Sequence, residues 1–131
     1  ARSHVGGYAA GNDLTRRDLQ AEAKDMGRPW DWAKGFDKSA VCGPVHKAED
    51  TGHLASGAIT LSVNGVLRQK GDLADMIWSV AEVVAYFSRY YRLCAGDLIF
   101  TGTPEGVGPV RPGDRLEGQI EGIGSLSVAV V

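Results

Sequence analysis

The sequence contains only two cysteines, Cys42 and Cys94, among its 131 residues. They lack the close spacing of a zinc or iron–sulfur motif, which argues against a cysteine-based metal centre. We therefore expect two reduced, buried thiols, as is usual for a cytosolic protein, with a disulfide between them as the alternative.

Long hydrophobic runs and an excess of one charge are also absent. No apolar stretch approaches the roughly 20 residues that a membrane helix needs. The formal net charge of −2 argues against nucleic acid or an anionic membrane as the main partner. No signal peptide is visible, and the opening ARSHVGGYAA is typical of the middle of a protein. We expect a cytoplasmic protein that binds neither nucleic acid nor membrane.

Glycine, in contrast, is abundant, with 18 residues, and this indicates tight turns between strands. Alternating segments 58–63 and 66–69 flank Asn64-Gly65, which is a strong type I′ hairpin signal. The pattern predicts further strands over 4–12, 97–100, 116–120 and 126–131. The length suits one domain, so we expect a single strand-rich α+β domain over residues 1–131 with two short helices.

The first helix is predicted to start at Thr15 as N-cap and to end before Gly27. Its apolar face should pack on the core through Leu19, Ala23 and Met26. The second helix is predicted over 79–91 from an apolar stripe. Residues 46–52 are polar and are interpreted as a surface loop; their His46-x-x-Glu49 spacing is treated as a chance match.

The segment from residue 13 to residue 34 carries the densest set of candidate site residues. Asp13 precedes the first helix, Lys34 follows it, and Arg17 and Gln20 lie one turn apart within it. These groups converge only if the helix folds back on its own entry strand. Such a site would suit a small, anionic, oxygen-rich substrate, together with a metal.

Each candidate also has an ordinary structural interpretation. Asp13 is either a strand-end residue satisfied by nearby amides or a ligand of a hard cation such as Mg²⁺. Lys34 lies among aromatic residues, so it either loses solvation and acts as a base or oxyanion partner, or its stem covers the rings with the ammonium in water. Arg17 and Gln20 form either an exposed helix face or a pair that binds an anion and a carbonyl.

The segment 101–109, TGTPEGVGP, is a further candidate. Its glycines allow main-chain N–H groups to turn inward, and Thr101 and Thr103 add hydroxyls, so the loop could hold a substrate carboxylate. It lacks the Gly-Lys-Ser/Thr ending of a P-loop. The alternative is a tight turn between strands.

Four blocks of the sequence, in order, are GYAAGNDLTRRDLQ, GRPWDWAKGFDKSAVCGPV, VNGVLRQKGDLADMIWSVAEVVAYFS and GDLIFTGTPEGVGPVRPGD. Together they resemble the C-terminal catalytic domain of the fumarylacetoacetate hydrolase family, nearest to its bacterial fumarylpyruvate and acylpyruvate hydrolases. The resemblance implies a β-rich roll of stacked, mixed sheets, and a homodimer.

The resemblance also implies roles for individual residues. Asp13 matches the family's aspartate that binds Mg²⁺ or Mn²⁺, and Lys34 matches the catalytic lysine at the metal site. Arg17 and Gln20 match residues that contact the 2-oxo-carboxylate and keto–enol system of a small 2-oxo acid substrate.

Gly102 and Thr103 match the loop that receives the substrate carboxylate. No Glu-x-Glu occurs in these 131 residues; the resemblance implies that this metal-binding pair and the family's His-Glu dyad lie upstream. We therefore expect that the N-terminal portion of the catalytic domain lies outside this sequence, with a degenerate remnant of the domain as the alternative.

The function implied is metal-dependent hydrolysis of a C–C bond in an acylpyruvate such as fumarylpyruvate, in the catabolism of aromatic compounds. Within the same family, decarboxylation of oxaloacetate or isomerisation of a 2-oxo acid is the alternative. A non-catalytic oligomerisation domain is the alternative outside enzymes.

Overall fold

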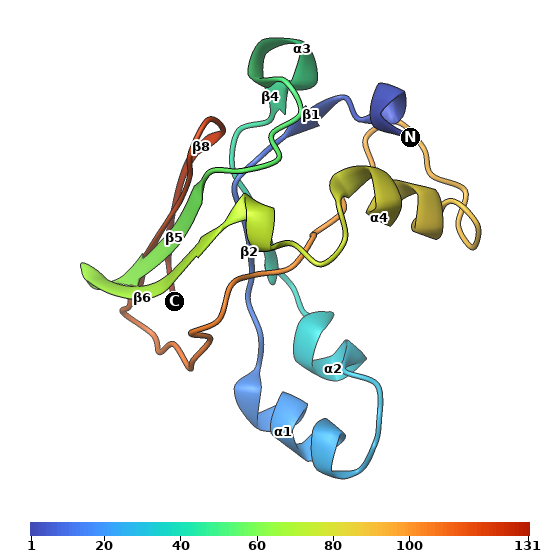
Figure 1. Ribbon diagram of the computed structural model, residues 1–131. Coiled ribbons are helices and arrows are strands. Elements are labelled where there is room, and N and C mark those ends of the chain that lie inside the picture. The colour runs from blue at the N-terminus through green and yellow to red at the C-terminus, as the bar shows by residue number, and fades with distance from the viewer.

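The computed structural model describes residues 1–131, which form three antiparallel sheets and several short helices (Figure 1). The strands are β1 (Gly7–Tyr8), β2 (Gly11–Asp13), β3 (Ala40–Cys42), β4 (His46–Lys47), β5 (Ala58–Val63), β6 (Val66–Asp72), β7 (Arg115–Ile120) and β8 (Gly124–Ala129). The α-helices are α1 (Arg17–Asp25), α2 (Asp31–Lys34), α3 (Ala48–Thr51) and α4 (Val80–Phe87). The 3₁₀ turns are η1 (Arg2–His4) and η2 (Leu73–Asp75).

The largest sheet has four strands in the order β6-β5-β7-β8. The β5–β6 hairpin turns at Asn64 and Gly65, whose φ angles of 52° and 77° are those of the predicted type I′ turn. A bulge between Leu61 and Ser62 shifts the register. The hairpin and the two closing strands β7 and β8 are therefore confirmed.

Two small sheets, β1-β4 and β2-β3, tie the N-terminal segment to residues 40–47. The predicted strand over 4–12 is thus two short strands, and β3 lies where no regular structure was expected. The prediction that 46–52 is a surface loop is wrong, because this stretch forms β4 and α3. Strands this short depend on their distant partners, and no local pattern marks them.

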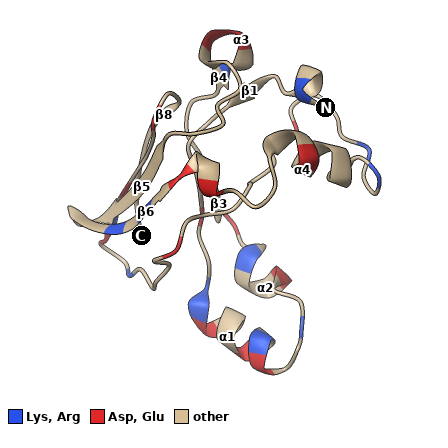
Figure 2. Ribbon diagram, in the orientation of Figure 1, with Lys and Arg blue, Asp and Glu red and all other residues tan.

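Helix α1 begins after Arg16, so the prediction of a Thr15 cap is wrong. The Thr15 hydroxyl instead donates to the main-chain oxygen of Asp13, at 3.2 Å. The expected packing of the apolar face is also wrong, because α1 has no buried residue and Met26 is 55% exposed. Figures 1 and 2 show why: α1 and α2 project away from the four-stranded sheet as a charge-rich lobe.

Helix α4 starts at a capping box in which Ser79 and Glu82 bind each other's main chain. It ends at Phe87, earlier than the predicted residue 91. The strand predicted over 97–100 is absent, because Asp97 closes a turn on Cys94 and the segment has no partner strand. Both cysteines are free, and Cys94 is exposed where a buried thiol was expected.

The core is small: four apolar residues, Ala10, Ala33, Leu116 and Ile123, and two polar residues, Ser39 and Gln69, are buried. The α+β, strand-rich class is confirmed. Every strand pair is antiparallel where mixed sheets were expected, and four α-helices replace the expected two. No helix combines the length and apolar character that a bilayer crossing requires.

Candidate active site

The fold-back that the candidate site requires is made by main-chain hydrogen bonds. After Asp13 the chain forms α1 and α2, then returns as β3 alongside β2, with Asp13 opposite Ala40. Leu14 N donates to Ser39 O at 2.8 Å, and Arg16 N donates to Ala33 O at 3.0 Å. Ala33 is 1% exposed at this contact, so its small side chain lets the two segments approach. The end of α2 is thereby held beside the end of β2.

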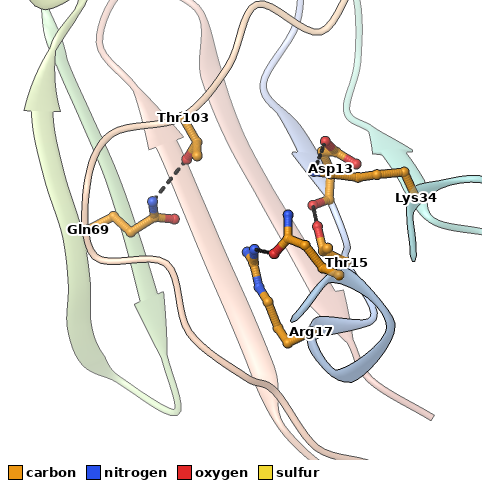
Figure 3. A network of polar contacts seen from close by, with 7 residues as sticks. Asp13, Thr15, Arg17, Lys34, Gln69 and Thr103 are labelled. Carbon is orange, nitrogen blue, oxygen red and sulfur yellow. Dashed lines mark hydrogen bonds and ion pairs between the residues drawn. The ribbon is translucent and has the colours of Figure 1, made fainter. Parts of the chain in front are cut away.

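This arrangement joins Asp13 and Lys34 in an ion pair. Lys34 Nζ lies 2.5 Å from Asp13 Oδ2, and the two side chains are 45% exposed for Asp13 and 33% for Lys34 (Figure 3). No main-chain amide binds the Asp13 carboxylate, and Trp32 is 85% exposed. The partner of each charge is therefore the other charge, rather than turn amides or aromatic rings.

Arg17 and Gln20, on the first turn of α1, are also paired. Arg17 Nη1 donates to Gln20 Oε1 at 2.8 Å. The Gln20 carbonyl is thereby occupied, and its NH₂ group remains available as a donor. The pair can offer guanidinium N–H groups to a carboxylate and an amide N–H to a carbonyl oxygen.

The loop 102–106 packs on β6. In Figure 3, Thr103 and Gln69 lie across the view from Asp13 and Lys34. Gln69 Nε2 donates to Thr103 Oγ1 at 2.9 Å and to the Pro104 oxygen at 2.6 Å. Gly106, with φ of 96°, packs so close that a Cβ would collide with the Arg68 carbonyl oxygen. Only glycine permits this approach. The loop is therefore held against β6 by packing and hydrogen bonds, and is more than a turn that connects two strands.

One cavity of about 970 Å³ is lined by all the predicted site residues, namely Asp13, Arg17, Gln20, Lys34, Gly102 and Thr103. Its walls carry four cationic side chains, Arg17, Lys24, Lys34 and Arg68, against two carboxylates, Asp13 and Asp114. The excess of positive charge favours an anionic ligand.

Gln69, Lys24 and Arg68 line the same cavity but were not predicted as site residues. The signal for Gln69 was weak: a polar residue in the alternating part of the hairpin.

His53, for which no partner was predicted, lies with Nδ1 2.6 Å from the Tyr8 hydroxyl. Burial raises the pKa of Tyr8 there, although a coulombic effect of Arg2 opposes it.

The donor set of the cavity fits a divalent cation through one ligand, the carboxylate of Asp13. Magnesium and manganese are hard cations for which one or two protein carboxylates with water and substrate oxygens suffice. No group of three or more His, Cys, Asp or Glu side chains in residues 1–131 could hold a metal by itself. The ammonium of Lys34 neutralises the same carboxylate.

Comparison with known proteins identifies the family of this chain. Residues 1–131 match the family described as fumarylacetoacetate (FAA) hydrolase C-terminal. A fumarylpyruvate hydrolase of Ralstonia sp is 47% identical over 130 residues, 99% of this chain and 67% of the relative. The oxaloacetate tautomerase YcgM of Escherichia coli is 44% identical over 122 residues, 92% of this chain and 56% of the relative.

A crystal structure of fumarylpyruvate hydrolase from Pseudomonas aeruginosa, in complex with Mn²⁺ and pyruvate, superposes with a TM-score of 0.96 at 55% identity. The match covers 100% of this chain and 56% of that chain. The present chain thus spans between about half and two thirds of these relatives. It belongs to the fumarylacetoacetate hydrolase family and corresponds to that family's C-terminal domain.

Proposed function

We propose that this protein is a divalent-metal-dependent hydrolase that cleaves a C–C bond of an acylpyruvate such as fumarylpyruvate. The observation that carries the proposal is the cationic cavity that is lined by the Asp13–Lys34 pair, the Arg17–Gln20 pair and Thr103. The hydrolase relatives at 47% and 55% identity support the same reaction.

The reaction adds the oxygen of water to the distal acyl carbon and breaks the bond between that carbon and C3 of the pyruvate unit. The bonding electron pair stays on the pyruvate part as an enolate, which then takes up a proton at C3. The products are a carboxylic acid, fumarate for fumarylpyruvate, and pyruvate. A stable position for the developing enolate is therefore the main requirement of the site.

Arg17 and the 102–103 loop would hold the substrate carboxylate through guanidinium, main-chain and hydroxyl donors. Gln20, whose Oε1 already accepts from Arg17, would donate its NH₂ group to the 2-oxo oxygen. Holding both ends of the 2-oxo acid orients the scissile bond and lowers the entropic part of the barrier.

Lys34 would place its ammonium beside the oxygen on which enolate charge develops. Mg²⁺ or Mn²⁺, held in part by Asp13, supplies a second positive charge there when bound. We propose that the remaining metal ligands, and the His-Glu pair that activates water, belong to polypeptide outside residues 1–131.

Tautomerisation of oxaloacetate is the second candidate, and the tautomerase relatives at 42–44% identity favour it. It needs the same binding of a 2-oxo acid and proton transfer at C3 but no attacking water. Decarboxylation of oxaloacetate would use the same groups to bind the 2-oxo acid. A non-catalytic oligomerisation domain would bind neither metal nor 2-oxo acid.

We further propose that the enzyme is a cytoplasmic homodimer that acts in the breakdown of aromatic compounds. A second copy would cover part of the exposed aromatic surface, which includes Trp78, Tyr86 and Tyr90 at 46%, 44% and 66% exposure.

Product analysis separates these reactions. The enzyme, supplied with Mn²⁺, is given fumarylpyruvate and oxaloacetate in separate reactions that are followed by NMR. We expect equal amounts of fumarate and pyruvate from fumarylpyruvate. Keto–enol exchange without cleavage of either compound would favour the tautomerase, and CO₂ release from oxaloacetate the decarboxylase. Failure to bind Mn²⁺ or to change either compound would favour the non-catalytic domain.

A further inference from the structure

Gln69 is a nearly buried amide, 7% exposed, that lies beneath the predicted carboxylate-binding loop. It sits on β6, and its Nε2 reaches three oxygens of the loop: Thr103 Oγ1 at 2.9 Å, Pro104 O at 2.6 Å and Glu105 O at 3.4 Å. The Gln69 side chain therefore links the β5–β6 hairpin to the loop that carries Thr103 (Figure 3).

The chemistry of these partners determines which way the Gln69 amide faces. The main-chain oxygens of Pro104 and Glu105 can only accept hydrogen bonds, so they require the NH₂ end of the amide. The same nitrogen then faces Thr103 Oγ1, and the threonine hydroxyl must accept. The reverse orientation would place an acceptor against two main-chain acceptors.

A hydroxyl that accepts from Gln69 has its own hydrogen free to donate. Thr103 donates to no group of the chain, and it lines the cationic cavity. Its O–H is thus available to a ligand that brings a hydrogen-bond acceptor, such as a carboxylate oxygen. With one lone pair engaged by Gln69, the hydroxyl offers this hydrogen to a ligand acceptor.

We propose that Gln69 is a positioning residue that fixes the Thr103 hydroxyl as a hydrogen-bond donor and so selects ligands with an acceptor, in particular a carboxylate. The proposal rests on the proposed function, in which Thr103 contacts the carboxylate of a 2-oxo acid. Gln69 does not touch the substrate; it acts through Thr103 and through the docking of the 103–105 loop.

The test is a double-mutant cycle on pyruvate binding, measured by calorimetry with the full-length enzyme saturated with Mn²⁺. The variants are Gln69→Leu, Thr103→Val and the two combined. A hydrogen bond to a charged group is worth about tenfold or more in affinity, so each single variant should raise the Kd of pyruvate about tenfold. The double variant should be no weaker than the weaker single variant, because both substitutions remove the same donor.

Two further variants separate positioning from general damage to the fold. Lys70→Met changes the exposed neighbour of Gln69 on β6 and should alter neither affinity nor melting temperature. Gln69→Glu keeps the length of the side chain but reverses its hydrogen-bonding direction, and it should weaken pyruvate binding even where Gln69→Leu fails to fold.

Wild-type affinity for pyruvate in Gln69→Leu or Gln69→Glu would overturn the proposal. So would an additive loss of about a hundredfold in the double variant, since Gln69 would then act independently of Thr103. In turnover of fumarylpyruvate, Gln69→Leu should raise KM more than it lowers kcat. The two proposals can fail separately. If the variants show this coupling in pyruvate binding but the wild-type enzyme cleaves no acylpyruvate, the proposed function is contradicted and the role of Gln69 stands.

Discussion

At the scale of the residue, the ammonium of Lys34 pairs with the Asp13 carboxylate, which we propose as a ligand of the metal. The two charges lie 2.5 Å apart and are both partly open to solvent. The ammonium beside Asp13 opposes the approach of a second cation to the same carboxylate. The same lysine is the one to which we assign the stabilisation of the enolate.

Replacing Lys34 with alanine should consequently change two quantities in opposite directions. Turnover of fumarylpyruvate should fall by about 10²–10³-fold, as expected for loss of a charge that stabilises a developing oxyanion. The Kd of Mn²⁺, measured by calorimetry, should fall several-fold because the competing ammonium is gone. Lys70→Ala, on the exposed side of β6, is the matched control. Full activity in Lys34→Ala would remove the lysine from the mechanism.

At the scale of the element, local and non-local signals account for what could be predicted. The β5–β6 hairpin was predictable because Asn64 and Gly65 dictate their own turn. Strand β3 was not, because it exists only through its pairing with β2. The same distinction applies to the site. Asp13, Lys34 and Thr103 lie in short sequence motifs that can be recognised locally. The role proposed for Gln69 instead depends on its hydrogen bond to Thr103, which lies 34 residues further along the chain.

The turn from β6 into η2 gives a prediction about pH. Asp72 caps η2, and hydrogen bonds from the main-chain N–H groups of Ala74 and Gly57 lower its pKa from the ordinary 3.8. Because the folded state holds the ionised form, this stabilisation is complete above the ordinary pKa and is lost as the pH falls through the lowered one. Asp72→Ala should therefore lower Tm by about 3 °C at pH 7.

The difference in Tm between wild type and Asp72→Ala should shrink across the pH range below the ordinary pKa of 3.8, where the wild-type carboxyl takes up its proton. Scanning calorimetry over this range measures it. Asp37→Ala, at an exposed loop carboxylate without a hydrogen bond, should show no such convergence. A Tm difference that does not change with pH would contradict the assigned role of the Asp72 charge.

At the scale of the whole molecule, the chain exposes more surface than a protein of its mass usually does. Its accessible area is 9351 Å², and only six of 131 residues are buried. A compact monomer of 13.9 kDa exposes about 6,700 Å², so the excess is roughly 2,700 Å². That is more than three times the area of about 800 Å² that one partner contributes to a standard interface. This surface supports our proposal that a second copy, and further polypeptide, cover it.

The homodimer is tested by sedimentation equilibrium of the full-length enzyme at micromolar concentration. We expect the mass of two chains, with no dissociation on tenfold dilution, since obligate homodimers bury large interfaces of about 2,000 Å² or more. A monomer mass throughout the range would contradict the dimer, and the exposed aromatic residues would then need another partner.

Metal-dependent cleavage of an acylpyruvate in the cavity at Asp13 is tested most directly by one rate measurement. The loss of the diketone absorbance of fumarylpyruvate is followed for the full-length wild type and for Asp13→Asn, each with Mn²⁺ and with EDTA. We predict turnover by the wild type with Mn²⁺, none with EDTA, and a loss of at least a hundredfold in Asp13→Asn, as about 10²–10³-fold is typical when a charge-stabilising group is removed. An undiminished rate in EDTA or in Asp13→Asn would contradict the account.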